Sequence, residues 1–188
     1  MEGKCIILCA PSGAGKTSIT KYLLEQDLGL EFSISACNRE KREGEIDGVD
    51  YHFLTTEDFK RRVDNNEFVE WEEVYKDNFY GTLKTEINRI WNSGKNVIFD
   101  VDVEGGLSLT KYFGEKALAI FIQPPSIEAL EERLRRRGTE NEEKIQKRLA
   151  KAGKELSYAK WFDTIIVNTN LEESQQETLQ IVKSFLRK

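Results

Sequence analysis

The chain has 188 residues and a formal net charge of −5, because 28 lysines and arginines are outnumbered by 33 aspartates and glutamates. This length favours one domain, or one core with inserted lobes, and it is enough to bury a core without disulfides or a structural metal. The net negative charge argues against a protein that coats nucleic acid, since such binding relies on a basic surplus.

The cysteine and histidine content excludes several catalytic classes. Three cysteines without a Cys-x-x-Cys pair, together with one histidine, form neither a disulfide framework nor a zinc cluster. His52 would have to carry any Ser-His-Asp or Cys-His chemistry by itself. No apolar run is long enough for a membrane span or a signal peptide, so we expect a cytoplasmic protein without a membrane partner.

Four short apolar runs predict strands that are buried on both faces, namely residues 5–9, 97–99, 118–122 and 164–167. Continuous runs of this kind are typical of parallel sheets. Helical patterns over residues 15–26, after a cap at Ser126 and after a cap at Asn170 separate the runs. Strands that alternate with helices predict an α/β fold with a parallel sheet and flanking crossover helices.

Two segments interrupt this alternation. Residues 32–80 combine short alternating strands and turn signals with a short helix that Thr55 is expected to cap. Residues 130–156 are highly charged and helical, with a turn after which Thr139 is expected to cap a second helix. We interpret the chain as one core with two inserted lobes rather than as tandem domains.

A phosphate-binding motif directly follows the first predicted strand. Residues 10–17, Ala-Pro-Ser-Gly-Ala-Gly-Lys-Thr, fit the pattern G-x-x-x-x-G-K-[ST] with alanine in the first position. Glycines let backbone N–H groups surround a polyphosphate, and the following helix directs its positive end towards it. Lys16 would reach the β- and γ-phosphates, and Thr17 would ligate Mg²⁺. The position between a strand and a helix favours this interpretation over a glycine-rich turn with a solvated lysine.

Two aspartates follow the second apolar run. Asp100 and Asp102 occupy alternate positions, so both side chains lie on one face of the strand end. Carboxylates at the carboxyl edge of a parallel sheet suit either a water-bridged Mg²⁺ or a substrate contact. Acids at such positions also cap helices or lie on the surface, and that alternative stays open at this stage.

A first arginine cluster follows an alternating segment. Arg39 and Arg42 are three residues apart, and Tyr51 and Tyr80 are candidate hydroxyl donors. Two guanidinium groups with phenols can enclose a phosphate monoester, a geometry that lysine does not supply. Taken alone, the same residues would also fit a solvated, charged loop.

A second arginine cluster lies in the charged helical segment. Arg133 and Arg137 are one helical turn apart, and Arg148 could fold back towards them. Like charges at this spacing repel unless an anion neutralises them, which suits a mobile lid over phosphates. A solvated face paired with neighbouring glutamates is the alternative. Glu70, in an apolar and aromatic setting, needs hydrogen-bond donors from an arginine or from the edge of a base.

These motifs, in this order, resemble the guanylate kinase family, whose members make GDP from GMP and ATP. The resemblance covers about residues 4–185. Its landmarks are the 10–17 motif, Arg39-x-x-Arg42-x-Gly44-Glu45, Asp47-Gly-Val-Asp-Tyr51-His-Phe53, Phe68-Val-Glu70-Trp71, Tyr80-Gly81-Thr82, Asp100-Val-Asp102, Pro124-Pro125-Ser126, Arg137-Gly138-Thr139-Glu140 and Lys147-Arg148-Leu149.

The resemblance implies a P-loop NTPase core (residues 1–33, 85–126 and 157–188), a GMP-binding lobe (34–84) and a helical lid (127–156). The implied GMP-binding residues are Ser35, Arg39, Arg42, Tyr51, Glu70, Tyr80, Thr82 and Asp102. The implied ATP-binding residues are Ala10, Pro11, Ser12, Gly13, Ala14, Gly15, Lys16, Thr17, Ser18, Arg133, Arg137 and Asn168. The implied catalytic residues are Lys16, Arg42, Arg137 and Arg148, and the implied metal ligands are Thr17 and, through water, Asp100.

The implied activity is transfer of the ATP γ-phosphoryl group to GMP and dGMP, with Mg²⁺, in purine nucleotide metabolism. The implied partners are ATP and GMP, with no nucleic acid and no membrane, and the oligomeric state stays open. One alternative is a guanylate-kinase-like binding module without activity, which the presence of Lys16, Thr17, Arg137 and Arg148 disfavours. The other is a P-loop kinase with a different acceptor, which Glu70 and Asp102 disfavour.

Overall fold

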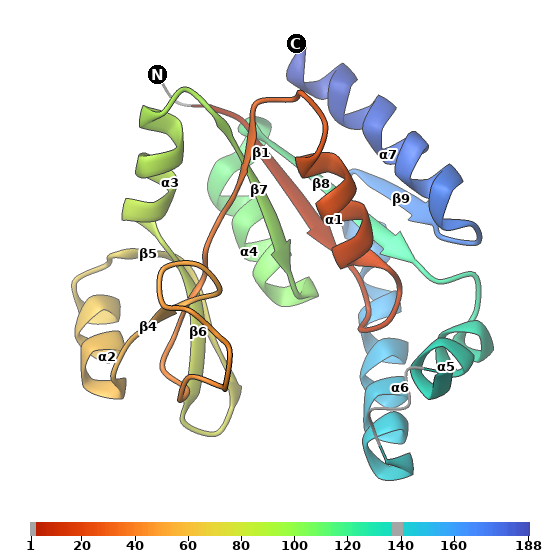
Figure 1. Cartoon of the computed structure of the whole chain (residues 1–188), viewed down its shortest axis with the longest axis horizontal. Coiled ribbons are helices and arrows are strands. Elements are labelled where there is room, and N and C mark those ends of the chain that lie inside the picture. Colours follow the sequence, from red (N-terminus) through yellow and green to blue (C-terminus); the bar gives the residue numbers. More distant parts are fainter. Residues whose placement is uncertain (1–2, 137–140) are drawn as a thin grey trace.

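The computed structural model describes residues 3–136 and 141–188, and its core is a five-stranded parallel sheet (Figure 1). The strand order is β2-β7-β1-β8-β9, and all neighbouring pairs are parallel. The strands are β1 (Cys5–Cys9), β2 (Leu30–Phe32), β7 (Asn96–Val101), β8 (Ala117–Gln123) and β9 (Thr164–Val167). The predicted α/β class and its parallel sheet are therefore confirmed.

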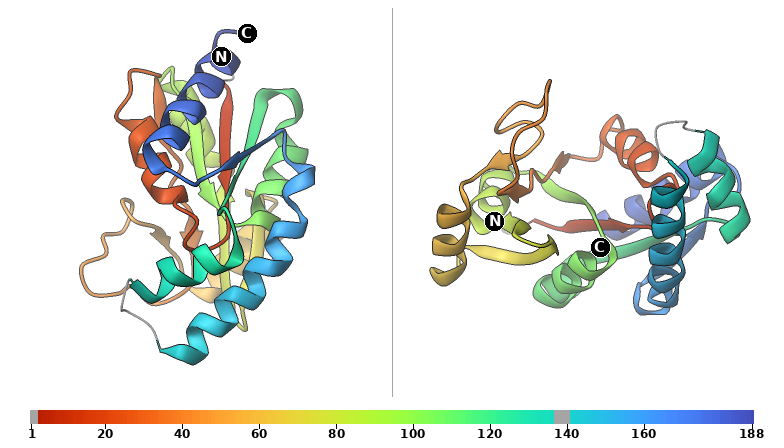
Figure 2. Two further views of the ribbon diagram at one scale, coloured as in Figure 1. Left: turned by 90° about the vertical axis from the view of Figure 1, so that its right-hand side faces the viewer. Right: turned by 90° about the horizontal axis from the view of Figure 1, so that it is seen from below.

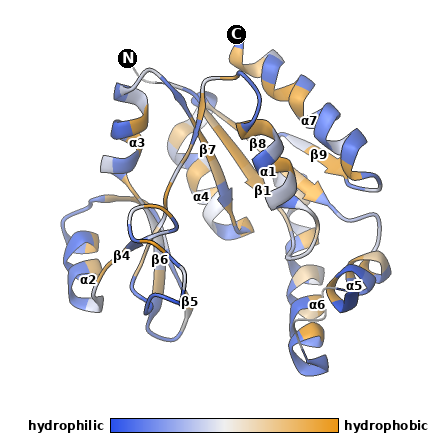
Figure 3. Ribbon diagram, in the orientation of Figure 1, coloured by the Kyte–Doolittle hydropathy of each residue, from blue (hydrophilic) through white to orange (hydrophobic). Residues whose placement is uncertain are grey.

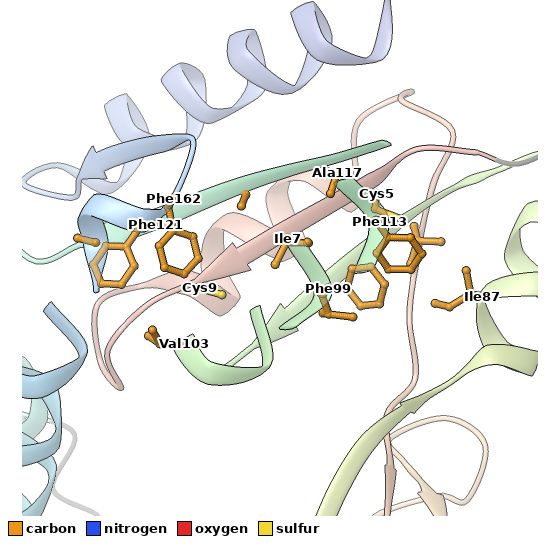
Figure 4. Close-up of a cluster of buried hydrophobic side chains, with 14 of the residues drawn as sticks. Cys5, Ile7, Cys9, Ile87, Phe99, Val103, Phe113, Ala117, Phe121 and Phe162 are labelled. Atoms are coloured by element: carbon orange, nitrogen blue, oxygen red, sulfur yellow. The ribbon is translucent and has the colours of Figure 1, made fainter. Parts of the chain in front are cut away.

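Helices cover both faces of this sheet, as Figure 2 shows. Alternate residues of β1 face opposite layers, because side chains alternate along a strand. Ile6 and Leu8 pack with helices α1 (Lys16–Leu24) and α7 (Leu171–Leu186). Cys5, Ile7 and Cys9 pack with α3 (Lys84–Asn92) and α4 (Val103–Phe113), and the close-up in Figure 4 displays this second layer. The burial of both faces explains why the β1 sequence is continuously apolar.

The first turn of α4 approaches β1 so closely that only glycine fits there. A Cβ atom placed on Gly106 would lie 2.1 Å from the Cys9 Sγ atom and 3.5 Å from the Ile7 Cγ2 atom. We expect Gly106→Ala to lower the free energy of unfolding by roughly 1–3 kcal/mol, because overpacking a core forces neighbours to move. Thermal or urea unfolding measures this change.

Gly153 provides the matched control, since it also lies in a helix, α6 (Glu142–Ser157), but has nothing within 4 Å of its added Cβ. Gly153→Ala should be neutral or should stabilise by up to about 1 kcal/mol, as alanine is the better helix former. Equal stabilisation by both substitutions would contradict the packing of α4 on β1. A Cys9→Ala change should partly restore the stability of the Gly106→Ala protein.

A second, smaller sheet lies beyond one edge of the core. Its order is β4-β3-β6-β5, formed by β3 (Ala36–Cys37), β4 (His52–Phe53), β5 (Phe68–Tyr75) and β6 (Asn78–Leu83). Helix α2 (Thr56–Asp64) inserts Phe59 between Phe68 and Phe79, at ring-centroid distances of 4.5 and 5.6 Å. Thr55 caps this helix by accepting a hydrogen bond from the Asp58 N–H at 3.0 Å, as the sequence predicts.

Helices α5 (Ile127–Arg136) and α6 lie at the other side of the molecule. They pack through Leu130, Leu134 and Ala152, while their charged faces point outwards (Figure 3). Ser126 caps α5 by accepting from the Ala129 N–H, as expected. The prediction for α6 was wrong: its N-cap is Asn141, which accepts from Lys144 N–H at 3.1 Å. Thr139 itself lies outside the described residues.

The small sheet and the α5–α6 pair flank the carboxyl ends of β1 and β7 from opposite sides (Figure 1). Short 3₁₀ turns at Gly114–Lys116 and Ala159–Trp161 complete the described elements. Within the described ranges, no helix combines the length and the apolar character needed to cross a bilayer. The architecture directs attention to the loops at this edge of the sheet, where ligands of open α/β sheets bind.

Candidate functional site

The phosphate loop (residues 10–17) connects β1 to the first turn of α1. Gly13 and Gly15 have φ values of 98° and 100°, a backbone region in which side chains are strained. Gly15 is also the N-cap of α1. The loop lines a pocket together with the helix start, so the positive end of α1 is available to an anion.

Asp100 joins the start of α1 to the end of β7. The sheet register places it beside Leu8, just before the phosphate loop begins. Lys16 Nζ lies 2.6 Å from Asp100 Oδ1 and also donates to the carbonyl oxygen of Val101. Thr17 Oγ1 donates to Asp100 Oδ2 at 3.1 Å. The lysine ammonium group is therefore held at the sheet edge, within the lining of the pocket.

The same contacts test whether the site suits Mg²⁺. Thr17 Oγ1 and Asp100 Oδ2 are hard oxygen donors, 3.1 Å apart. Magnesium prefers such ligands and keeps several waters or phosphate oxygens in its remaining positions. Among the described residues, no three His, Cys, Asp or Glu side chains cluster as a ready metal cage. The oxygen pair fits a magnesium ion that arrives with a nucleotide.

A second pocket, of about 230 Å³, lies beside the phosphate loop, between the small sheet and the end of β7. Its described lining includes six residues that the sequence predicted as site residues: Ser35, Tyr51, Glu70, Tyr80, Asp100 and Asp102. A seventh, Thr82, is buried and donates its Oγ1 to Glu70 Oε1 at 2.7 Å. This pocket and the phosphate-loop pocket share Asp100, Asp102 and Lys151, so ligands in the two would be adjacent.

The environment of Glu70 makes it receptive to N–H donors. Burial raises the pKa of Glu70 to about 7, and the charge of Asp102 acts in the same direction, although the Thr82 hydrogen bond opposes them. A carboxyl group in this state is stabilised as an anion when a ligand donates hydrogen bonds to it. Perturbed carboxyl groups in a pocket are typical of functional sites.

The first arginine cluster is only partly assembled around this pocket. The Arg39 guanidinium lies 4.9 Å from the centroid of the Tyr51 ring, which is 6.0 Å from that of Tyr80. Arg39 also binds both carboxylate oxygens of Glu45, at 2.6 and 2.7 Å. Arg42 is exposed, and its backbone N–H donates to Glu45. As far as the structure describes the pocket lining, it contains the two phenols but neither arginine.

Of the second arginine cluster, Arg148 meets the phosphate loop from α6. Arg148 Nη1 donates to Ser12 Oγ at 2.7 Å, which brings the guanidinium to the loop. Ser12 lines the phosphate-loop pocket, together with Pro11 and Ser18. Arg137 lies outside the described residues, so its predicted role stays a prediction.

Arg133 contacts Asn168, another residue of the predicted ATP-binding set. Its Nη2 donates to the carbonyl oxygen of Asn168 at 2.8 Å. Asn168 is buried, and its Nδ2 donates to the Ala14 carbonyl oxygen at 2.7 Å. Its Oδ1 has no hydrogen-bond partner among the described residues. Arg133 and Asn168 therefore line a separate pocket beside Gly15.

Two residues of the shared pocket region were missed from the sequence. Glu72 follows Glu70 by two positions on β5 and lines the same pocket. Lys151 follows Arg148 by three positions on α6 and lines both pockets. The sequence signal for Glu72 was its spacing of two residues from Glu70 in a strand, and that for Lys151 was its spacing of three residues from Arg148 in a helix. Both spacings place the two side chains on a common face of the element.

Comparisons with known proteins agree over the whole length of the chain. A family model described as Guanylate kinase matches residues 2–188. The chain is 54% identical over 188 residues to a guanylate kinase of Bacteroides thetaiotaomicron, covering 100% of this chain and 92% of that protein. It is 50% identical to one from Porphyromonas gingivalis, covering 98% and 99%. A crystal structure of guanylate kinase from Anaplasma phagocytophilum superimposes with a TM-score of 0.77 at 30% identity, covering 99% and 87%.

Proposed function

The chain belongs to the guanylate kinase family, and we propose that it transfers the γ-phosphoryl group of ATP to GMP, giving ADP and GDP. We further propose dGMP as a second acceptor and purine nucleotide metabolism as the context. The observation that carries this proposal is that two adjacent pockets have lining residues in common. The phosphate loop with Lys16 lines one pocket, Glu70 lines the other, and Asp100 and Asp102 line both.

The acceptor in this reaction is a phosphate group, whose oxygen is already anionic near neutral pH. No general base is needed, and the main obstacle is the repulsion between two polyanions. Lys16, which belongs to the phosphate loop, and Arg148, which contacts Ser12 of that loop, would neutralise charge on the transferring group, with Arg42 and Arg137 as further cations. When bound at Thr17 and Asp100, Mg²⁺ would supply additional neutralisation of the phosphate oxygens.

The chain is organised, in this proposal, around a core of residues 1–33, 85–126 and 157–188. Residues 34–84 form the acceptor lobe, and residues 127–156 form a lid. The contact between Arg148 and Ser12 supports a lid that approaches the phosphate loop. Closure of both parts would exclude water, which otherwise competes with GMP for the phosphoryl group.

Base selection follows from counting hydrogen-bond donors. Guanine carries N1–H and an exocyclic N2–H₂ group, and we propose that Glu70 and Asp102 accept from them. Thr82 supports Glu70 in this role through the 2.7 Å hydrogen bond. Ser35, Arg39, Arg42, Tyr51 and Tyr80 complete the proposed GMP site, at its phosphate end. The residues 10–18, with Arg133 and Asn168, would bind ATP.

An acceptor panel tests the proposal directly. Purified protein with ATP and Mg²⁺ is assayed with GMP, dGMP, AMP, CMP and UMP. We expect rapid conversion of GMP and dGMP only. Conversion of a different nucleotide would indicate another P-loop kinase, and a folded protein that binds GMP but converts none of the five would indicate a binding module.

The protonation of Glu70 predicts a pH dependence of base binding. Its pKa is raised to about 7 in the free protein, and guanine N–H donors favour the anion, so binding should release a proton. The affinity should therefore increase with pH, by roughly fivefold to tenfold between about pH 6 and pH 7.5. Calorimetric titration with guanosine measures this, because the GMP phosphate itself titrates near pH 6.

Glu70→Gln is the control for this measurement. Glutamine keeps one oxygen acceptor but has no proton to release, so guanosine affinity should be lower and independent of pH over the same range. An unchanged pH dependence in the Glu70→Gln protein would assign the titration to another group.

A further inference from the structure

Lys151 brings a positive charge to the boundary between the two nucleotide pockets. It lies on α6, three residues after Arg148, whose contact with Ser12 brings this part of the helix to the phosphate loop. Residues three apart on a helix share a face, so Lys151 is directed to the same side. It lines both the phosphate-loop pocket and the pocket of about 230 Å³ that contains Glu70, which we call the acceptor pocket.

The acceptor pocket is otherwise acidic. Its described lining contains four carboxyl groups, on Glu70, Glu72, Asp100 and Asp102, and among these lining residues Lys151 carries the single positive charge. A phosphate monoester carries between one and two negative charges near neutral pH, and ionised acids repel it. A phosphate that enters this pocket therefore needs a cation close by.

The other cations proposed for the reaction have different surroundings. Arg39 binds both carboxylate oxygens of Glu45, at 2.6 and 2.7 Å, and Arg42 is exposed. Lys16 lies 2.6 Å from Asp100 and lines the phosphate-loop pocket. Lys151 therefore adds a cation at a place that these three side chains do not occupy in the described structure.

The ammonium group of Lys151 is available to a ligand. Its Nζ lies 3.8 Å from Asp102 Oδ2 and 3.5 Å from Glu155 Oε1, whereas charge-assisted hydrogen bonds measure about 2.7–2.9 Å. The side chain is 58% exposed, and a lysine ammonium moves on a flexible four-carbon chain. It can thus turn to a phosphate oxygen without breaking a short ion pair.

The requirements of phosphoryl transfer place the acceptor phosphate near this group. The attacking oxygen must lie close to the γ-phosphorus and in line with its leaving oxygen. In the proposed reaction the acceptor phosphate therefore lies where the two pockets meet. The residues common to both described linings are Asp100, Asp102 and Lys151, and of these only Lys151 can attract an anion.

We propose that Lys151 binds the phosphate group of the acceptor nucleotide, by donating a hydrogen bond from its ammonium group to a phosphate oxygen. The inference rests on the proposed function, because it assigns the acceptor pocket to GMP. It adds a cation from α6 to the phosphate end of the GMP site, which the arginines and phenols of the small-sheet lobe otherwise form.

Lys151→Met tests the contact, since methionine keeps an unbranched side chain and removes the charge. The dissociation constant and the KM for GMP should rise at least about tenfold, a typical loss for a hydrogen bond between charged groups. Guanosine has the same base and ribose but no phosphate, so its dissociation constant should change less than about threefold. The affinity for ADP should also change less than about threefold.

Binding is measured by calorimetry at pH 7.5 with saturating ADP and Mg²⁺ and without ATP. Both pockets are then occupied, and no phosphoryl group can be transferred to GMP. The comparison of GMP with guanosine separates a phosphate contact from an effect on the base end of the pocket, where Lys151 also lies close to Asp102. Thermal unfolding of each variant identifies any general loss of structure.

Lys154→Met is the matched control. Lys154 lies one helical turn further along α6, and its Nζ is 3.3 Å from Glu104 Oε1. It belongs to the described lining of neither the acceptor pocket nor the phosphate-loop pocket. The substitution removes the same charge from the same helix, so GMP and guanosine affinity should both stay within about twofold of the unmodified protein.

A change of less than about threefold in GMP affinity of the Lys151→Met protein would overturn the inference. Equal losses for GMP and guanosine would do so as well, because the effect would then lie at the base. The same holds for a loss confined to ADP, or for an equal loss of GMP affinity in the Lys154→Met protein. A folded, unmodified protein that neither binds nor converts GMP would instead contradict the proposed function.

Discussion

Replacing Lys16 with methionine should lower kcat by about 10³-fold while GMP affinity changes less than about threefold. The ammonium group is fixed between Asp100 and the Val101 carbonyl oxygen at the sheet edge, so it needs no reorganisation when charge develops on the phosphoryl group. Removal of one such preorganised group from a low-dielectric site costs about 10²–10³ in rate, and a transition-state cation up to about 10⁵.

Methionine is the informative replacement because it keeps an unbranched side chain of similar length and removes only the charge. Steady-state kinetics with saturating ATP and GMP measure kcat, and calorimetry measures GMP binding. A Lys16→Arg protein tests geometry, since guanidinium is planar and longer than ammonium and should restore little activity. A loss of less than tenfold in the Lys16→Met protein would remove Lys16 from the proposed catalytic set.

The second large expected effect concerns the acceptor base. The kcat/KM for GMP should exceed that for AMP by about 10⁴–10⁵, the factor by which sites that demand a hydrogen bond reject analogues that lack it. Adenine has an unprotonated N1, so it would face Glu70 and Asp102 without donating to both. Burial raises the pKa of Glu70, and an anion left there without donors would be costly.

The measurement needs a wide range of enzyme concentration, because AMP turnover is expected to be very slow. A coupled assay for ADP, with ATP hydrolysis subtracted, gives both specificity constants on one scale. Glu70→Gln should reduce the preference by at least about tenfold, since the amide presents a donor where guanine also has donors. A GMP preference below about 100-fold in the unmodified protein would contradict base selection by these acids.

Local features of the sequence located the phosphate loop correctly, because its chemistry depends on neighbours in the chain. The glycines adopt their positive φ values within one loop, and Lys16 and Thr17 belong to the helix that follows it. The capping roles of Thr55 and Ser126 are local in the same sense, and both are confirmed. The prediction for Thr139 failed because Asn141, two residues further on, caps α6 with equal chemistry.

Contacts between distant segments could not be predicted in detail. Acidic side chains compete for each arginine, and Glu45 holds Arg39 although the spacing also suited a phosphate site. Arg133 contacts Asn168 through a carbonyl oxygen, a partner that has no sequence signature. Glu72 was passed over because a second glutamate on an exposed-looking strand resembles ordinary surface charge until its neighbours are known.

The sequence by itself determined the α/β class, the phosphate loop and the set of residues from which a nucleotide site could be built, because these depend on periodicity and on short motifs. The tertiary structure alone decided which of these side chains share a pocket. Parallel register brings Asp100 beside the loop, β5 carries Glu70 and Glu72 towards Asp102, and α6 brings Arg148 to Ser12. The last of these contacts joins residues 136 positions apart. Their geometry is set by the packing of whole elements, and no local pattern encodes it.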